Sequence, residues 1–572
     1  MYKRAALIFL VGSGLFAAAT TPVPQPVFIV LYSRFYDHSH QHTTDERLQR
    51  LLPILEQLHK QYPQSGISAL FQFSGTVSQV LYQENAGLHL VDQLKDYSGR
   101  NLVDIGYTGE DEPSYLYRPK PDLLLAETPE ARWAAKCEAA ERFLNDFKNP
   151  ITGLPVPGLS GGLKRTQEVF GNVTFISGLT RMLGGDSPSM HEARKMNPTA
   201  VLCGIPAPDA KRGIEGFGIS AERFSQFMSP DPAESPEVFW EDNLLRLSDT
   251  SLNDNRPHST DEGPEALKKV FEKLDRRHVR IVKLEVAAYR RYLTRRADGS
   301  VVVDPLEWLY YHPDDPIIPL TMHALVTQTE VEAGYKKDEA TLKWLLEEFL
   351  PANPGSRFLS VRGLAQMPLA AESEVSADQL KELATELNEQ FVKLPMQPPD
   401  FGRAGGSFFT LAESFDLLAQ ALAGFDKTGS MPKSVALTPM YGPLTLPNDM
   451  GPTTGSVPVS AVIQAAAQMA PKLANTEWKR VPDNAVPASI QAGPLRVNAS
   501  QFLRLMAQAC LDPSPDKILK VNAVTLSTRS TFMFPKNTAI TDQGNSWTFK
   551  PAPLRAGTTE TSRSSAGKSG TQ

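Results

Sequence analysis

The chain has 572 residues, enough for two or three domains of about 150 residues each, and its hydrophobic content of 41% can supply real cores. The formal net charge is −6, with acidic and basic residues interspersed along the sequence. These values exclude a disordered chain, a basic nucleic-acid-binding surface and a polybasic membrane patch. Small molecules and glycans remain as partner classes.

The first 19 residues have the layout of a secretory signal. A basic start precedes an apolar run that is too short to span a bilayer, and alanines follow at positions 17–19. This order is typical of a cleaved signal peptide, with an uncleaved anchor as the alternative. We therefore expect residues 1–19 to be removed. The mature protein would be exported to the periplasm, the cell envelope or the extracellular space, with no integral membrane segment.

An apolar segment opens the mature chain. Residues 27–32 are a run of β-branched, aliphatic and aromatic residues, typical of a strand buried on both faces. Asp37, His38, His40 and His42 follow it. Side chains at the carboxyl ends of parallel strands form the sites of α/β enzymes. The sequence therefore favours a site for a divalent metal here over an ordinary polar loop.

The next segments alternate between strand and helix patterns. Residues 67–73 and 101–107 are strand candidates, and helical spacing lies before each of them. This βαβ alternation predicts a parallel sheet or barrel. The strand candidate at 101–107 is followed by three acidic residues, Glu110, Asp111 and Glu112. We expect them at the catalytic edge of the sheet.

Further strands are expected later in the barrel. The candidates are residues 173–177, 200–205, 279–286 and 357–361. Residues 206–264 are irregular and polar, and we expect them to be insertions over the barrel mouth.

Residues 308–316 form an aromatic and acidic cluster that reads W-L-Y-Y-H-P-D-D-P. Aromatic rings pack on sugar faces, and carboxylates bind hydroxyl groups. The candidates for substrate contact are Tyr107, Glu112, Trp308 and Tyr311. His312 is a candidate general acid. The alternative is a plain turn, because Pro-Asp-Asp-Pro is turn chemistry.

The remainder of the chain reads as a separate region. Residues 371–391 are an acidic helical pattern that we interpret as a linker, and residues 392–550 form a smaller, mainly α-helical accessory domain. Within that domain an apolar lead-in, an N-cap and an amphipathic helix recur at 408–423, 457–470 and 495–511. The predicted N-caps are Thr410, Ser460 and Asn498. Residues 551–572 are expected to be a disordered tail.

Residues 20–370 resemble the polysaccharide deacetylase-like superfamily, which is related to family 57 glycoside hydrolases. Three places carry this resemblance. They are the strand that ends in Asp37-His38, the strand 103–107, and the helix and strand at 338–361 that end the first domain. It implies an α/β fold, a distorted (β/α)7 barrel. Members hold zinc or another divalent metal with one aspartate and two histidines, and the metal activates water against an acetyl carbonyl.

The resemblance assigns roles to residues of this chain. Asp37, His38 and His40 would hold the metal, Glu110 or Asp111 would be the general base or an additional ligand, and His312 would protonate the leaving group. The family's H-x-x-x-H motif after the strand 103–107 is absent here. Either the Asp37 cluster holds the metal with help from Glu110 or Asp111, or metal chemistry has been lost. In the second case a carboxylate pair is an alternative, as in family 57.

The accessory domain is similar to cell-wall-binding repeats of the pseudomurein-binding type, which implies a polysaccharide or cell-wall glycan as partner. Together these patterns predict an exported hydrolase that deacetylates an envelope or extracellular polysaccharide. The alternative is a non-catalytic glycan-binding or structural envelope protein on a degenerate barrel.

Overall fold

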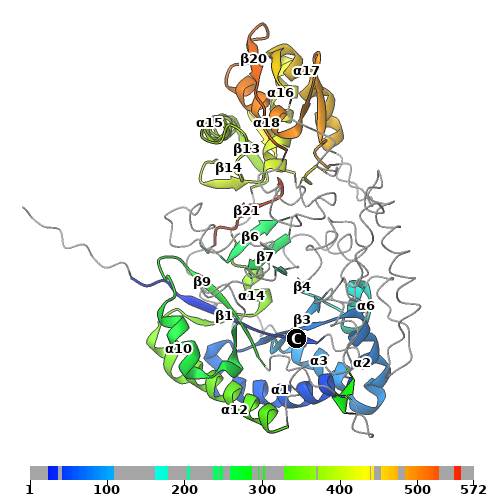
Figure 1. The fold of residues 1–572 in the computed structure, drawn as a ribbon, viewed down its shortest axis with the longest axis vertical. Helices are drawn as coiled ribbons and strands as arrows, with labels where there is room; N and C mark the ends of the chain where they lie inside the picture. The colour runs from blue at the N-terminus through cyan, green and yellow to red at the C-terminus, as the bar shows by residue number, and fades with distance from the viewer. Residues whose placement is uncertain are drawn as a thin grey trace, which may run out of the picture.

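The structure is a computed structural model of the chain (Figure 1). The residues that it describes are 23–35, 41–108, 162–177, 202–205, 235, 237–241, 244–248, 258–286, 294–295, 301–302, 328–368, 372–438, 440–443, 453–474, 484–526 and 547–554.

One 11-stranded sheet organises the first part of the chain. Seven of its strands are joined by parallel ladders in the order β7-β5-β4-β3-β2-β1-β9, and the two-residue strand His258–Ser259 extends this parallel run beyond β9. Their bounds are β1 Val27–Phe35, β2 Ala69–Phe73, β3 Val103–Thr108, β4 Phe175–Ser177, β5 Leu202–Ile205, β7 Leu244–Ser248 and β9 Arg280–Glu285. Chain order increases from β1 to β7, and β9 returns to pair with β1. This is the cyclic order of a (β/α)7 barrel. Among the described residues, no ladder joins β7 to β9 or to the strand beyond it. The predicted α/β class is confirmed.

Short strands extend this sheet. They are β6 Val238–Glu241, β8 His258–Ser259, β12 Arg357–Phe358 and β21 Lys550–Pro551. β6 pairs antiparallel with β7, and β21 pairs antiparallel with β6. We expected residues 206–264 to be irregular, and this was wrong for β6, β7 and β8. β6 and β7 have only four or five residues each, too few to show a period against the polar sequence around them.

Helices cover one face of the sheet. Figure 1 shows α1, α3, α10 and α12 together in the lower part of the view, beneath β1 and β9. The longer helices of this part of the chain are α1 Gln41–Gln61, α2 Gly75–Leu88, α3 Leu90–Gly99, α6 Gly162–Phe170, α10 Pro264–Glu272 and α12 Gln328–Trp344. Because strand side chains alternate, Val27, Ile29 and Leu31 of β1 pack into the core under these helices. Phe28 and Val30 lie in a second core on the opposite face, which we call the inner face.

The described residues between 372 and 526 form a C-terminal unit, which is a structural duplication. Each half consists of a strand, a helix, a β-hairpin, a helix and a strand, and its first and last strands pair antiparallel. The first half has β13 Glu374–Ser376, α15 Ala377–Lys393, β14 Gly402–Ala404, β15 Ser407–Phe409, α16 Leu411–Thr428 and β16 Ser434–Ala436. The second half has β17 Gly455–Pro458, α17 Val459–Leu473, β18 Ser489–Ala492, β19 Leu495–Asn498, α18 Ala499–Leu511 and β20 Ile518–Val521.

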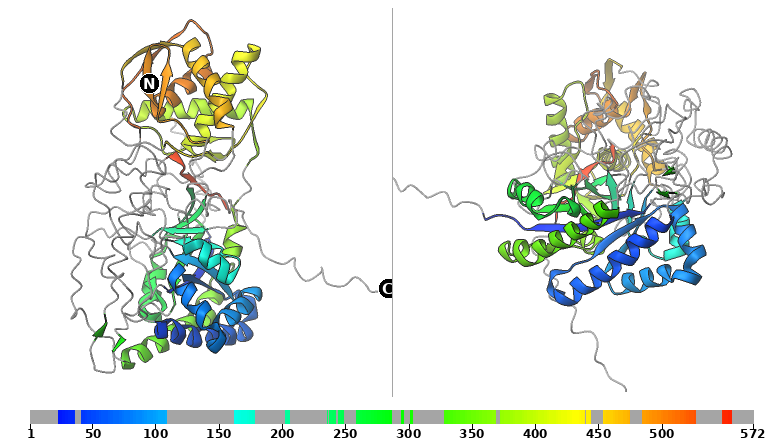
Figure 2. Two further views of the ribbon diagram at one scale, coloured as in Figure 1. Left: turned by 90° about the vertical axis from the view of Figure 1, so that its right-hand side faces the viewer. Right: turned by 60° about the horizontal axis from the view of Figure 1, so that its bottom comes forward.

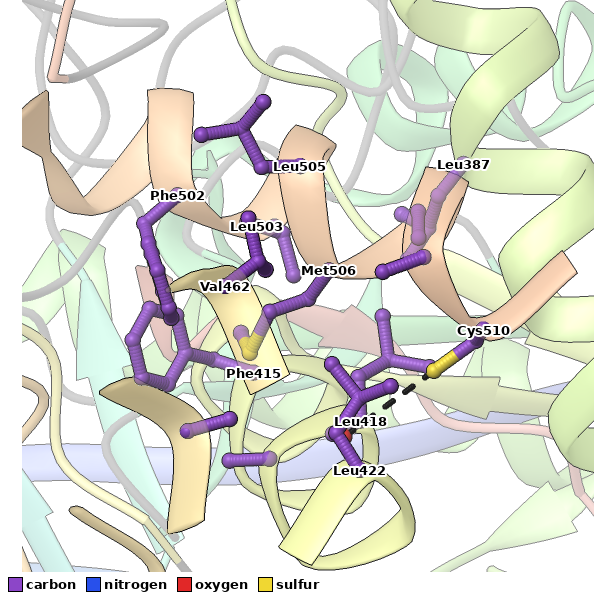
Figure 3. Close-up of a cluster of buried hydrophobic side chains, with 14 of the residues drawn as sticks. Leu387, Phe415, Leu418, Leu422, Val462, Phe502, Leu503, Leu505, Met506 and Cys510 are labelled. Atoms are coloured by element: carbon purple, nitrogen blue, oxygen red, sulfur yellow. Dashed lines mark hydrogen bonds between the residues drawn. The ribbon is translucent and has the colours of Figure 1, made fainter. Parts of the chain in front are cut away.

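The two halves share one hydrophobic core. Figure 3 shows Phe415 of α16, Val462 of α17, and Phe502 and Met506 of α18 gathered in this core, with Leu387 of α15 beside them. All five side chains are completely buried. Figure 1 and the left view of Figure 2 place the C-terminal unit at the end of the molecule away from α1, α2 and α3.

The predicted linker at 371–391 was wrong. It forms β13 and most of α15, and α15 buries Leu383 and Leu387 in the core of the C-terminal unit. It is a fourth copy of the recurring pattern, since Ser376 caps α15 in a capping box with Gln379. The linker was predicted from the acidic residues on the outer surface of this helix, and the apolar residues on its other face were not taken into account.

The capping predictions were mostly correct. Thr410 and Asn498 cap α16 and α18, and their side-chain oxygens accept hydrogen bonds from the backbone N–H groups of Glu413 at 3.0 Å and Gln501 at 2.9 Å. Ser460 is not an N-cap, because α17 begins at Val459.

A strap formed by residues 547–554 connects the C-terminal unit to the barrel sheet. Trp547 is completely buried in the core of the C-terminal unit, and its indole N–H donates to the carbonyl of Leu526 at 2.8 Å. Two residues later, the Phe549 ring packs against Phe239 of β6, with the ring centroids 5.2 Å apart. The strap therefore has one aromatic anchor in each part of the molecule.

Lys550 of the strap also contacts both parts of the molecule. The Lys550 ammonium pairs with Glu413 of α16 at 2.7 Å, while the backbone of Lys550 pairs with Trp240 of β6. Further on, Leu554 forms a β-bridge with Pro368. The prediction of a disordered tail from residue 551 was therefore wrong for residues 551–554. Residues 555–572 lie outside the described residues.

A buried carboxyl group makes the stability of the C-terminal unit depend on pH. Asp416 of α16 is completely buried, and Gln420 donates to its Oδ2 at 2.6 Å. Its Oδ1 has no hydrogen-bond partner among the described groups. Burial raises the pKa of Asp416 from 3.8 to about 7. The folded state therefore favours the protonated acid, and stability falls as the pH rises from about 4 to about 7.

We expect Asp416→Asn to stabilise the C-terminal unit at pH 8 by about 1 to 3 kcal/mol, with a smaller gain at pH 5. Urea unfolding followed by circular dichroism at both pH values measures the difference. The control is Asp426→Asn, at an exposed position near the end of the same helix. Equal gains for Asp416→Asn at pH 5 and pH 8 would contradict the assignment.

Candidate functional site

Polar side chains gather on the inner face at the carboxyl end of β1 and β9. Val30 and Ile281 lie in the apolar core of this face, so the alternation of strand side chains also places Tyr32, Arg34, Lys283 and Glu285 on it. Gln72 of β2 joins them, because it is in register with Arg34. We call Tyr32, Arg34, Gln72, Lys283 and Glu285 the inner-edge cluster. Barrel enzymes place their reacting groups at this end of their strands.

An ion pair joins β1 to β9 within the inner-edge cluster. Arg34 Nε lies 3.6 Å from Glu285 Oε1, and the two side chains are 32% and 10% exposed. This separation is a charge contact and not a hydrogen bond. Oε1 makes no hydrogen bond among the described groups. The ion pair therefore fixes a largely buried carboxylate at the carboxyl end of β9.

Lys283 lies behind this ion pair. Its residue is 4% exposed, and its Nζ is 4.8 Å from the centroid of the Tyr32 ring and 5.8 Å from that of Phe175. Desolvation, with a further contribution from the Arg34 charge, lowers the pKa of Lys283 to about 7. Desolvation and Glu285 raise the pKa of Tyr32, so its hydroxyl stays protonated. Lys283 is therefore the group of the cluster that changes charge near neutral pH.

Two helices begin beside the strands of this edge. The N–H of Ser74, the N-cap of α2, donates to the carbonyl of Phe35, the last residue of β1, at 3.1 Å. A Cβ placed on Gly75 would lie 2.5 Å from the Cα of Gly162, so α2 and α6 start in contact. Helix N-termini carry partial positive charge. Both positive ends therefore lie near the carboxyl ends of β1 and β2.

Two predicted site residues lie within the described ranges, and one of them, His42, falls in the first turn of α1. The other is Tyr107. It is completely buried on the helix-facing side of β3, because strand alternation groups it with Val103 and Ile105. Its ring packs beneath the start of α6, where a Cβ on Gly162 would lie 2.4 Å from the Tyr107 hydroxyl oxygen. The structure therefore places Tyr107 in the core and not on the inner face.

The other predicted site residues lie outside the described residues. They are the metal ligands Asp37, His38 and His40, the catalytic residues Glu110, Asp111 and His312, and the substrate contacts Glu112, Trp308 and Tyr311. Within the described ranges, no three His, Cys, Asp or Glu side chains are placed to hold a metal ion. No helix in these ranges is both long enough and apolar enough to cross a bilayer.

The sequence did contain a signal for the residues that we missed. The strand predicted at 279–286 reads V-R-I-V-K-L-E-V. Lys283 and Glu285 are two positions apart in a run whose other residues, apart from Arg280, are apolar. Charged residues with this spacing share one face of a buried strand, where each needs a partner or a function.

Comparison with known proteins gave few matches. No protein-family model matches the chain, and no curated protein matches it. Among solved structures, the chain is similar to a 4-alpha-glucanotransferase from Thermococcus litoralis, with a TM-score of 0.28 and 11% sequence identity. The match covers 65% of this chain and 45% of that one, so the chain spans less than half of the length of that enzyme.

Proposed function

We propose that this protein is an exported carbohydrate-active hydrolase that removes acetyl groups from an envelope or extracellular polysaccharide. The reaction would take place at the carboxyl ends of β1 and β9. The observation that carries the proposal is the inner-edge cluster, which places Glu285, Arg34 and Lys283 at the end of a parallel barrel where enzymes of this architecture act.

The chain path supports a metal site next to this cluster. β1 ends at Phe35, two residues before Asp37. The segment with Asp37, His38 and His40 therefore begins at the edge that holds the Arg34–Glu285 ion pair. One carboxylate and two imidazoles are a donor set that suits zinc. These three residues would hold the ion, which when bound polarises an acetyl carbonyl and activates water.

Residues of the chain would carry the proton transfers. Glu110 or Asp111 would accept the proton of the attacking water, and His312 would donate one to the leaving oxygen or nitrogen. Trp308 and Tyr311 would pack on sugar rings, with Glu112 bound to a hydroxyl group. The C-terminal unit would bind the polymer and hold it near the barrel.

The test combines metal content with acetate release. After incubation with zinc, purified mature protein is expected to retain about one equivalent, measured by elemental mass spectrometry, and to release acetate from acetylated xylan or chitin oligomers. The double variant His38→Ala, His40→Ala should lose the metal and lower acetate release by more than about 100-fold. The control is His89→Asn, since His89 is exposed and has a φ of 54°, which asparagine tolerates. Retention of metal and activity by the double variant would refute this ligand assignment.

A second candidate is glycan binding without catalysis. It is favoured by the absence of the H-x-x-x-H motif after β3, where the sequence reads Y-T-G-E-D-E. In that case zinc-treated protein would release no acetate from any of these polymers, yet would still sediment with insoluble cell-wall glycan.

A further inference from the structure

The carboxyl end of β1 extends beyond the strand that pairs with it on one side. The parallel ladder between β1 and β9 ends at the pair of Tyr32 and Glu285, whereas β1 continues to Phe35. On the other side, β2 stays paired with β1 as far as Phe35. Among the described residues, the last three of β1, 33–35, therefore have a strand partner on one side only. Arg34 of the inner-edge cluster is one of these three.

Arg47 of α1 lies on the side where the ladder with β9 has ended. The N–H of Val286 donates to the Tyr32 carbonyl at 2.7 Å. Because backbone carbonyls alternate sides along a strand, the Arg34 carbonyl points to the same side as that of Tyr32. Arg47 Nη1 donates to the Arg34 carbonyl at 2.9 Å. The guanidinium therefore binds a backbone acceptor just beyond the end of the β1–β9 ladder.

Two further contacts join the same guanidinium to β1. Arg47 Nη2 donates to the Ser33 hydroxyl oxygen at 2.7 Å, and the guanidinium carbon lies 4.5 Å from the centroid of the Phe35 ring. The Phe35 ring in turn packs on Phe71 and Phe73 of β2, with centroid separations of 5.3 Å and 5.1 Å. Arg47 therefore contacts three consecutive residues of β1, at a hydroxyl group, a backbone carbonyl and a ring.

Arg47 is separated from the inner face by the strand itself. Its residue is 2% exposed, and a buried guanidinium costs free energy unless it is hydrogen-bonded. The Phe35 ring that it contacts belongs to the core on the helix-facing side of β1, whereas Arg34 pairs with Glu285 on the inner face. Any effect of Arg47 on the inner-edge cluster therefore passes through the backbone of β1 and not through direct contact.

We propose that Arg47 is a positioning residue of the inner-edge cluster. By holding residues 33–35 of β1 it fixes the Arg34 side chain beside Glu285, with Arg34 Nε 3.6 Å from Glu285 Oε1. The inference rests on the proposed function only for its consequence on turnover, because the hold on β1 is a property of the fold. It adds to that function a residue outside the reacting edge that sets the geometry of the candidate site.

Hydrogen exchange of single amides, measured by mass spectrometry, tests this hold without reference to activity. The N–H groups of Ser74 and Val286 donate to the carbonyls of Phe35 and Tyr32, so their exchange reports on the end of β1. In the full mature protein we expect Arg47→Met to raise both exchange rates about tenfold relative to amides in the middle of β1. Arg47→Lys keeps a cationic donor and should raise them less.

Leu48→Ala is the matched control. Leu48 is the next residue of the same helix and is completely buried in the core on the helix-facing side. Its truncation leaves a cavity and destabilises the protein without removing a side-chain hydrogen bond to β1. Exchange should therefore rise in the same proportion at Ser74, at Val286 and in the middle of β1. If Arg47→Met does not fold, Arg47→Gln, which keeps an amide donor, replaces it with the same expectation.

The consequence for turnover is a change in kcat. With an acetylated polymer that the wild type deacetylates, we expect Arg47→Met to lower kcat more than about tenfold and to leave KM within about threefold. The reason is that the charge beside Glu285 moves while the proposed sugar contacts do not. Because Arg47 acts through Arg34, Arg47→Met should lower kcat little further in an Arg34→Met background. Leu48→Ala should keep the wild-type kcat at a temperature at which it is folded.

The outcomes separate this inference from the proposed function. Equal relative exchange in Arg47→Met and Leu48→Ala would overturn the inference whatever the activity. A wild-type kcat in Arg47→Met would also overturn it and would leave the hydrolase proposal standing. If exchange at Ser74 and Val286 rises as expected and the wild type releases no acetate from any polymer, the positioning role stands and the hydrolase proposal falls.

Discussion

Replacement of Trp547 by alanine is expected to lower the free energy of unfolding of the C-terminal unit by about 3 to 5 kcal/mol. The indole is completely buried among residues of the core, with its ring centroid 6.2 Å from that of Phe415. Its N–H donates to the Leu526 carbonyl, so the truncation leaves both a cavity and an unsatisfied carbonyl. Thermal unfolding followed by circular dichroism measures the loss.

The position of Trp547 makes the result specific. It lies 21 residues beyond Leu526 in the sequence, so its contribution requires the strap to return to the C-terminal unit. Met396→Ala is the control, because Met396 is 57% exposed and its loss should change stability by less than about 0.5 kcal/mol. Similar losses for both variants would show that Trp547 is not an anchor.

Replacement of Arg280 by methionine is the second large effect and is expected to cost about 3 to 5 kcal/mol of stability. Arg280 begins β9 and forms an ion pair with Glu237, and the two side chains are 3% and 0% exposed. Ser235 also donates to Glu237 Oε2 at 2.8 Å. Without the guanidinium, a carboxylate would be buried in the sheet with no opposite charge.

The pH dependence of Arg280→Met tests the mechanism. Burial raises the pKa of Glu237 even with Arg280 present, and loss of the arginine raises it further. Folding of the variant then favours the protonated acid, so its stability should be higher at pH 5 than at pH 8. The double variant Arg280→Met, Glu237→Leu should recover most of the loss. Arg277→Met is the control, because that arginine is 72% exposed and pairs with Asp275 on the surface. Equal destabilisation by both arginine variants would contradict the buried pair.

The parallel barrel could be predicted because buried parallel strands have a local signature. Residues 27–32, 101–107 and 279–286 are apolar runs with helical patterns between them, and each contains or overlaps a strand of the sheet. The strand order then follows the chain order, because consecutive parallel strands usually lie next to each other in a sheet. β6 and β7 escaped prediction because their pairing partners, and not their own residues, define them as strands.

The candidate site could be predicted only in part. A site at the end of β1 was predicted from the segment after it, in which Asp37, His38 and His40 lie outside the described residues, and Arg34 before that segment was not included. Lys283 and Glu285 were hidden within a predicted strand. Their contact with β1 depends on the pairing of residues about 250 positions apart, and no local pattern contains that information.

The strap at 547–554 could not be predicted either, because its contacts are with residues distant in the sequence. Trp547 and Phe549 lie in a short segment with no extended period, and each finds its contacts in a different part of the molecule. The sequence placed Trp547 and Phe549 in the last residues of the accessory domain 392–550, and a tryptophan there favours a buried position.

The course of the strap means that the C-terminal unit is inserted into the barrel and not appended to it. The chain leaves the barrel after Pro368, builds the duplicated unit, and then returns through residues 547–554 to extend the barrel sheet. A unit held by two covalent crossings has far less rotational freedom than one on a single tether. Any ligand bound by the unit would therefore meet the barrel in a limited set of orientations.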